Sequence, residues 1–143
     1  MLPRLLSQMT QSFKNVLVIG GSYVGSRAAA ELALALPPSH RVVLVEPHSH
    51  FQHLFVFPRV AVAEGFAHKA FIPFDGYFAA QGAAPEKGCF MRARVCQLLA
   101  GSALLDRDVG GVREVPYEYA VLATGTLLSP PGTLAVEGEC WCP

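Results

Sequence analysis

The sequence predicts an α/β fold whose central feature is a parallel sheet led by a β-α-β unit. Two short and predominantly apolar runs, Asn15–Ile19 and Arg41–Val45, lie on either side of Tyr23–Leu36, a segment rich in strong helix formers. Runs without a polar alternation are typical of strands that are buried on both faces of a parallel sheet. The order strand, helix, strand therefore predicts parallel strands joined by a right-handed crossover.

Each element of this unit ends at a residue that favours termination. The first strand runs directly into Gly20, and Pro37 stops the helix. The second strand ends at Glu46, which Pro47 follows. The helix carries few charged residues, which indicates that it packs against the sheet.

The segment from residue 48 to residue 78 shows no long periodicity. It is rich in aromatic residues, and Pro58, Gly65 and Pro73 interrupt it. We expect loops here, with one short helix at Val60–Glu64.

Several strands are expected after this segment. Cys89–Leu99 and Ser102–Asp106 are predicted to pair, and Val112–Val115 adds a third strand, giving a small antiparallel element from about 88 to 116. Tyr119–Ala123 has the character of a buried strand again, so we expect it to return to the main sheet.

Composition restricts the class of protein. The chain has 143 residues, the size of one domain, and its eleven basic and eleven acidic side chains leave no net charge. Without a basic field, nucleic acid is not expected as a partner. Hydrophobic residues make up 52% and charged residues 15%, which excludes intrinsic disorder. No apolar run approaches the roughly 20 residues that a membrane-spanning helix needs.

A glycine-rich turn follows the first strand. It reads Gly20-Gly21-Ser22-Tyr23-Val24-Gly25 and opens the helix, where backbone amides and the helix dipole favour a dinucleotide pyrophosphate. Gly20 permits the tight turn, and Gly25 lets the helix approach the strand. Ser22 replaces the middle glycine of the usual motif, although its hydroxyl can donate a hydrogen bond to an anion.

Glu46 strengthens this interpretation. It lies 21 positions after Gly25, at the end of the second strand, where a carboxylate accepts hydrogen bonds from ribose hydroxyls. Its charge would repel a 2′-phosphate. The alternative, in which the glycines only form an ordinary turn and Glu46 is merely solvated, explains less of the pattern.

Other polar groups are less promising. His48, His50 and His53 cluster, but they lack a fourth ligand and helical spacing, so no metal site is expected. Asp106 and two further acidic residues are expected to coat a hairpin rather than to act as an acid and a base.

The four cysteines are expected to be free thiols, because no secretory signal precedes them. This places the protein in a reducing compartment, the cytoplasm, and a mitochondrial leader at Met1–Ser12 is the less favoured alternative because that segment has a single Arg. Residues 47–88 hold no cysteine, which disfavours thiol-disulfide chemistry. The pair Cys140 and Cys142 is expected to lie in a frayed tail.

The combination of motifs resembles the apoptosis-inducing-factor-like flavoproteins. The segments that carry this resemblance are Val16–Gly25, Glu46, Ser49–Arg59, His68–Phe74 and Tyr119–Gly125. This family, which includes AMID-type and ferroptosis-suppressor proteins, belongs to the FAD-dependent pyridine-nucleotide-disulfide oxidoreductases. The resemblance covers about residues 14 to 130 and implies a Rossmann-like FAD-binding domain.

The resemblance also implies roles for individual residues. The FAD pyrophosphate would lie over Gly20–Val24, and the adenosine ribose would bind Glu46. The backbone of Val95 would meet the adenine. By the same resemblance, further residues would contact the flavin nucleotide, lie near the flavin or close over the cofactor: Arg59, Lys69, Thr124 and Gly125.

Family members reduce FAD with NADH or NADPH and pass electrons to a quinone-like acceptor. They continue into an NAD(P)H-binding unit at the point where this chain stops. We therefore expect a fragment, with an N-terminal extension at 1–13, part of an FAD/NAD(P)-binding domain at 14–130 and an irregular tail at 131–143. The alternatives are a catalytically incomplete nucleotide-binding module and, less favoured, a plain NAD dehydrogenase domain.

Overall fold

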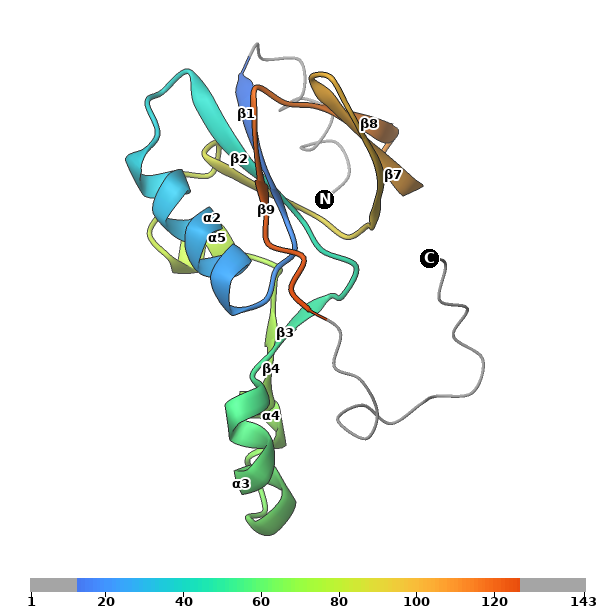
Figure 1. Ribbon diagram of the computed structural model, residues 1–143. Coiled ribbons are helices and arrows are strands. Elements are labelled where there is room, and N and C mark those ends of the chain that lie inside the picture. The colour runs from blue at the N-terminus through green and yellow to red at the C-terminus, as the bar shows by residue number, and fades with distance from the viewer. Residues whose placement is uncertain (1–12, 127–143) are drawn as a thin grey trace.

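A four-stranded sheet with all strands parallel forms the centre of the molecule (Figure 1). The computed structural model describes residues 13–126. The strands are β1 (Lys14–Ile19), β2 (His40–Val45), β5 (Gly88–Met91) and β9 (Tyr119–Leu122), in the order β5-β2-β1-β9. The expected parallel pairing of the first two strands is confirmed, with each residue of β1 opposite one of β2.

Helices cover one face of this sheet. Helix α2 (Tyr23–Ala35) joins β1 to β2, as predicted, and the short helix α5 (Tyr77–Ala80) lies on the same side (Figure 1). The two helices and the sheet share one core, whose buried members are Val18, Ala29, Ala33, Val42, Leu44, Phe74, Phe78 and Ala83. Every second residue of β2 therefore points toward the helices.

A smaller antiparallel sheet covers the opposite face. Its strands are β6 (Val95–Leu99), β7 (Ser102–Val109) and β8 (Val112–Pro116). A second core fills the space between the sheets and is formed by Leu17, Ile19, Val43, Val45, Met91, Ala93, Ala103, Leu105 and Val115. The α/β class with a small antiparallel element is thereby confirmed. Strands β1 and β2 are buried on both faces. The return of β9 to the main sheet is as expected, but its predicted burial is wrong, because β9 is an edge strand with Tyr119 59% and Leu122 67% exposed.

The prediction of one strand over Cys89–Leu99 is wrong. This segment forms the end of β5 and all of β6, which belong to different sheets. The chain turns between them at Arg92–Arg94, where Ala93 is fully buried and its N–H donates to the carbonyl oxygen of Met91. The segment Cys89–Leu99 thus contains a corner at its two arginines, where the chain passes from one sheet to the other.

An arm made of short elements projects from the sheet (Figure 1). We use this name for residues 50–73, whose base is an antiparallel pair of strands, β3 (His50–Gln52) and β4 (Phe71–Pro73). Between them lie the 3₁₀ turn η1 (Leu54–Val56) and two helices, α3 (Phe57–Val62) and α4 (Ala67–Ala70).

The arm corrects the expectation of loops with a helix at Val60–Glu64. The observed helix begins three residues earlier, because Pro58 occupies its first turn, a position where the missing N–H of proline costs nothing. The paired strands β3 and β4 have only three residues each, which is too short to produce a pattern in the sequence.

The order of the strands defines where a ligand can bind. From β1 the chain moves outward through β2 to β5, and then returns to the other side of β1 as β9. In open α/β sheets, ligands bind beside the carboxyl ends of the strands at such a reversal. In the described part of the chain, no helix has both the length and the apolar character needed to cross a membrane.

Candidate functional site

A cavity of about 360 Å³ lies at the carboxyl ends of the central strands. Its volume is within the range of about 300–1,000 Å³ that small-molecule sites occupy. The cavity brings together residues that are far apart in the sequence but were predicted to share a site, namely Gly20, Gly21, Ser22, Glu46, Val95 and Thr124.

Close contacts with neighbouring atoms require glycine at three positions of this turn. Gly20 has a φ of +100°, and a Cβ there would collide with the carbonyl oxygen of Ala123. At Gly21 a Cβ would lie 2.8 Å from the ring of Phe74 and 2.9 Å from Cγ of Glu46. A Cβ at Gly25 would collide with the carbonyl oxygen of Gly20, so this glycine allows α2 to pack against the turn.

The start of α2 is open to a ligand. The N-cap residue Ser22 is exposed, and among the described residues its side chain makes no capping hydrogen bond. Its carbonyl oxygen accepts the first helical bond, from the N–H of Ser26 at 2.9 Å. The preceding N–H groups of the first turn have no partner within the helix, so they can donate to an anion.

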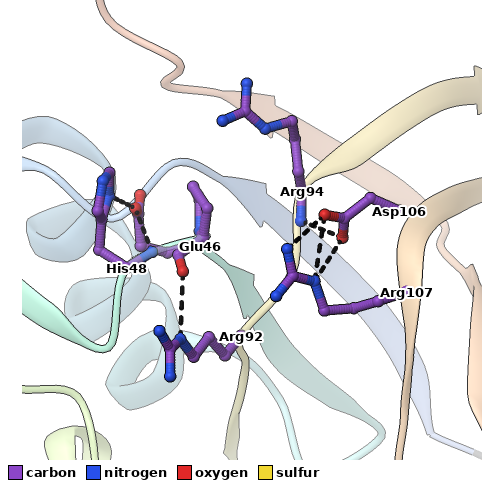
Figure 2. A network of polar contacts seen from close by, with 7 residues as sticks. Glu46, His48, Arg92, Arg94, Asp106 and Arg107 are labelled. Carbon is purple, nitrogen blue, oxygen red and sulfur yellow. Dashed lines mark hydrogen bonds and ion pairs between the residues drawn. The ribbon is translucent and has the colours of Figure 1, made fainter. Parts of the chain in front are cut away.

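Glu46 is fixed beside this turn by hydrogen bonds. Its Oε2 accepts the N–H of Gly21 at 2.7 Å. Its Oε1 accepts the N–H of His48 at 3.0 Å and also contacts His48 Nδ1 (Figure 2). Only 11% of the Glu46 side chain is exposed. The carboxylate is therefore held in one orientation at the wall of the cavity.

The corner between β5 and β6 forms another wall. Ala93, Arg94 and Val95 all line the cavity, and Val95 is the first residue of β6. Arg94 is linked to β7 by hydrogen bonds with Asp106 (Figure 2). The predicted backbone contact at Val95 thus lies in a segment whose position is set by a second sheet.

The remaining predicted residues lie outside the lining of this cavity. Gly125 follows Thr124 with a φ of +73°. Tyr23, Val24 and Gly25 form the first turn of α2, and Val24 is 73% exposed.

Arg59 and Lys69 are exposed residues of the arm. They lie on α3 and α4, and both contact the ring of Phe66, with centroid distances of 5.4 Å and 4.7 Å. Their roles near the flavin therefore stay predictions.

Tyr23 connects the glycine turn to the arm. Its hydroxyl lies 2.8 Å from Nδ1 of His53 and accepts the N–H of Phe55 at 3.4 Å. Its ring also packs edge-on against Phe51, with centroids 4.9 Å apart. These contacts place the base of the arm against the start of α2.

The histidines have separate partners. His48 contacts Glu46, His53 contacts Tyr23, and His50 Nδ1 lies 2.8 Å from the hydroxyl of Ser49. Within residues 13–126, no group of three or more His, Cys, Asp or Glu side chains is arranged to hold a metal ion.

Two of the four cysteines lie in the described region. Cys89 and Cys96 are free, and burial raises the pKa of the Cys89 thiol, so this side chain is a poor nucleophile. The expectations for Cys140 and Cys142 fall outside the described residues.

Sequence reasoning missed several residues of the cavity. His50, Phe51, Phe74 and Arg94 line it. The first three lie in segments that carry the family resemblance, but none of the four was assigned to a wall of this site. They come from the arm, its connection to α5, and the corner between the sheets, and only the folded chain brings them together. The positive charges of Arg92 and Arg94, which lie on either side of Ala93, were a sign in the sequence that the apolar segment is interrupted there.

Comparison with known proteins places the chain among relatives of apoptosis-inducing factor. No protein-family model matches it. It is 32% identical over 131 residues to Fe-regulated protein 8 of Mycosarcoma maydis, covering 88% of this chain and 33% of the relative. It is 31% identical over 121 residues to ferroptosis suppressor protein 1 of Mus musculus, covering 82% and 28%. It is 30% identical over 118 residues to apoptosis-inducing factor homolog B of Dictyostelium discoideum, covering 82% and 27%.

A solved structure shares the fold. The sulfide:quinone oxidoreductase from the hyperthermophilic bacterium Aquifex aeolicus superposes with a TM-score of 0.65 at 21% identity, covering 81% of this chain and 25% of that one. The chain spans about a third or less of the length of the curated relatives it matches. These similarities confirm the resemblance found in the sequence: this chain is similar to a part of proteins of the apoptosis-inducing-factor-like family.

Proposed function

We propose that this chain is the FAD-binding portion of an NAD(P)H-dependent oxidoreductase that passes electrons to a quinone-like acceptor. The observation that carries the proposal is the cavity in which the glycine turn, Glu46, Val95 and Thr124 share one space. The names of the relatives and of the sulfide:quinone oxidoreductase support the class of reaction.

The chemistry of the cavity fits the adenosine diphosphate half of FAD. Uncapped N–H groups at the start of α2 suit a pyrophosphate, and the oriented carboxylate of Glu46 suits ribose hydroxyls. The exposed side chain of Ser22 leaves the turn open and adds a hydroxyl donor. The backbone at Val95 would meet the adenine.

The flavin end is assigned to the other predicted residues. Arg59 and Lys69 would approach the flavin nucleotide from the arm, and Thr124 and Gly125 would close over the cofactor after β9. When bound, FAD supplies two-electron redox chemistry between the nicotinamide donor, NADH or NADPH, and the acceptor. The residues of this chain bind and orient it.

Cofactor binding is the first test. Purified protein mixed with FAD and passed through gel filtration should keep the visible absorption band of the flavin. Glu46→Gln should raise the Kd for FAD by about tenfold or more, because a charge-assisted hydrogen bond to the ribose is weakened.

A matched variant controls for charge alone. Glu31→Gln removes a carboxylate on the exposed side of α2, where its partner is Arg27, and should leave the Kd unchanged. A folded wild-type protein that loses all flavin on the column, or equal affinities of the two variants, would contradict the assignment.

Adding NADH to the flavin-bound protein without oxygen distinguishes the two forms of the proposal. Bleaching of the band means that the chain itself accepts electrons from the nicotinamide. Retained flavin without bleaching favours the alternative, a catalytically incomplete module that binds the cofactor without turnover of its own.

A further inference from the structure

The corner between β5 and β6 is held by a side chain from another strand. Asp106 lies on β7, twelve residues further along the chain than Arg94. Its Oδ1 accepts the N–H of Arg94 at 2.9 Å, and its own N–H donates to the carbonyl oxygen of Arg94 at 2.9 Å. Both backbone groups of Arg94 are therefore bonded to a single residue.

These hydrogen bonds lie at the end of the antiparallel pairing between β6 and β7. Val95 is opposite Leu105, and the register shifts between Val95 and Gln97, as in a β-bulge. Bulges bend a strand and disturb its pairing. The Asp106 carboxylate supplies a bond just before this irregular point, so the chain entering β6 has a fixed path beside the cavity.

Arg107 holds the carboxylate in place. Its Nε lies 3.1 Å from both oxygens of Asp106, and a terminal nitrogen lies 2.7 Å from Oδ2. The hydrogen bond from Arg107 is the main reason that the pKa of Asp106 lies below its ordinary value, so the group is ionised at neutral pH. Figure 2 shows Arg107 beside the carboxylate and the guanidinium of Arg94 directed away from it.

We propose that Asp106 is a positioning residue for the adenosine end of the nucleotide site. It fixes the backbone from Arg94 to Val95, the wall that would meet the adenine, without touching the cofactor itself. The inference rests on the proposed FAD site, and it gives the antiparallel sheet a role in binding. Asp106, expected from the sequence only to coat a hairpin, would thus act on the site through Arg94.

Three variants test this role by the affinity for FAD and for ADP, which shares the adenosine end. Asp106→Ala removes the acceptor and should raise both Kd values by about tenfold, and by the same factor. Asp106→Asn keeps an oxygen for the Arg94 N–H, so its Kd values should stay within about threefold of the wild type. Asp108→Ala is the matched control, because Asp108 accepts an N–H from Gly111 in the turn between β7 and β8 and not from Arg94.

If Asp106 only stabilised the fold, Asp106→Ala would lower the unfolding temperature without raising the Kd values for FAD and ADP by the same factor. Circular dichroism and thermal melting must therefore show that each variant is folded, and hydrogen exchange should show a protected Arg94 amide in the wild type and a faster one in Asp106→Ala. If Asp106→Ala does not fold, Arg107→Gln is the variant that tests the proposal. It loosens the Asp106 carboxylate without removing it and should raise the Kd values for FAD and ADP by about threefold.

The outcomes separate this inference from the proposed function. A folded wild-type protein that binds neither FAD nor ADP overturns both. Wild-type binding with unchanged affinity in folded Asp106→Ala, or a loss for FAD alone, overturns the role of Asp106 and leaves the FAD site standing. An unprotected Arg94 amide in the folded wild type also overturns it.

Discussion

The parallel sheet and the arm bury their apolar side chains to very different extents. Leu17, Val18 and Leu44 of the sheet are fully buried, whereas Phe55 and Val62 of the arm are 81% and 86% exposed. Because burial of apolar surface is the main favourable term in folding, the sheet is stabilised by its own packing. The arm depends on a few contacts at its base.

This difference divides the proposed cofactor site. The residues assigned to the adenosine diphosphate half lie at strand ends or at the start of α2, next to the buried core. Arg59 and Lys69, assigned to the flavin end, lie on the arm. If the proposed assignment is right, the adenosine end is formed by the sheet itself, while the flavin end depends on how the arm is held.

The largest effect on stability is expected from a substitution where α2 packs against the glycine turn. Gly25→Leu places a side chain where even a Cβ collides with the carbonyl oxygen of Gly20. The free energy of unfolding should fall by about 3 kcal/mol or more, because helix and turn must separate. Thermal unfolding followed by circular dichroism measures this change.

The neighbouring residue provides the control. Val24 belongs to the same helical turn but is 73% exposed, so Val24→Leu should change the free energy of unfolding by less than about 0.5 kcal/mol. A soluble Gly25→Leu variant that unfolds like the wild type and still binds FAD would refute the close approach of α2 to the glycine turn.

The sheet could be predicted from the sequence because its signals are local. β1, α2 and β2 each carry their own pattern of apolar residues, and the glycine turn and Glu46 have a fixed spacing within that unit. The prediction of a single strand at Cys89–Leu99 was wrong because a mostly apolar segment does not reveal which sheet each of its halves joins. That choice depends on β2 for one half and on β7 for the other.

The arm and the Asp106 contact could not be predicted for a different reason. A helical period is recognised over about 11–18 residues and a strand alternation over about 4–8, and the strands and helices of the arm, with three to six residues, are shorter than these windows. Asp106 contacts Arg94 across an antiparallel pair whose register is shifted, so spacing alone does not bring the two together. Sequence motifs thus identify the glycine turn proposed for the phosphates more readily than the walls proposed for the base.

A smaller effect, confined to the flavin end, is expected in the arm. Arg59→Ala should raise the Kd for FAD by about tenfold and leave the Kd for ADP unchanged, because ADP lacks the flavin half. Titrations of both ligands by fluorescence or equilibrium dialysis give the two constants. Arg113→Ala, an exposed arginine of β8, is the control and should change neither. Equal losses for FAD and ADP would show that the two ends are not separately anchored, and unchanged FAD affinity would remove Arg59 from the site.

The smallest effect tests the base of the arm itself. Tyr23→Phe removes the hydroxyl that lies 2.8 Å from His53 Nδ1 but keeps the ring against Phe51. A hydrogen bond contributes about 1 kcal/mol, so the arm should open several-fold more often while the sheet unfolds at nearly the same temperature.

Trypsin detects this opening, since Arg59 and Lys69 are its cleavage sites within the arm. Cleavage there should be about fivefold faster in Tyr23→Phe, which corresponds to the loss of about 1 kcal/mol. Tyr119→Phe, at an exposed tyrosine of β9, should cleave like the wild type. If cleavage in the arm is equally fast in all three proteins, the Tyr23 hydroxyl does not hold the arm. Its position would then follow from the pairing of β3 with β4 alone, and the flavin end would be as firmly tied to the sheet as the adenosine end.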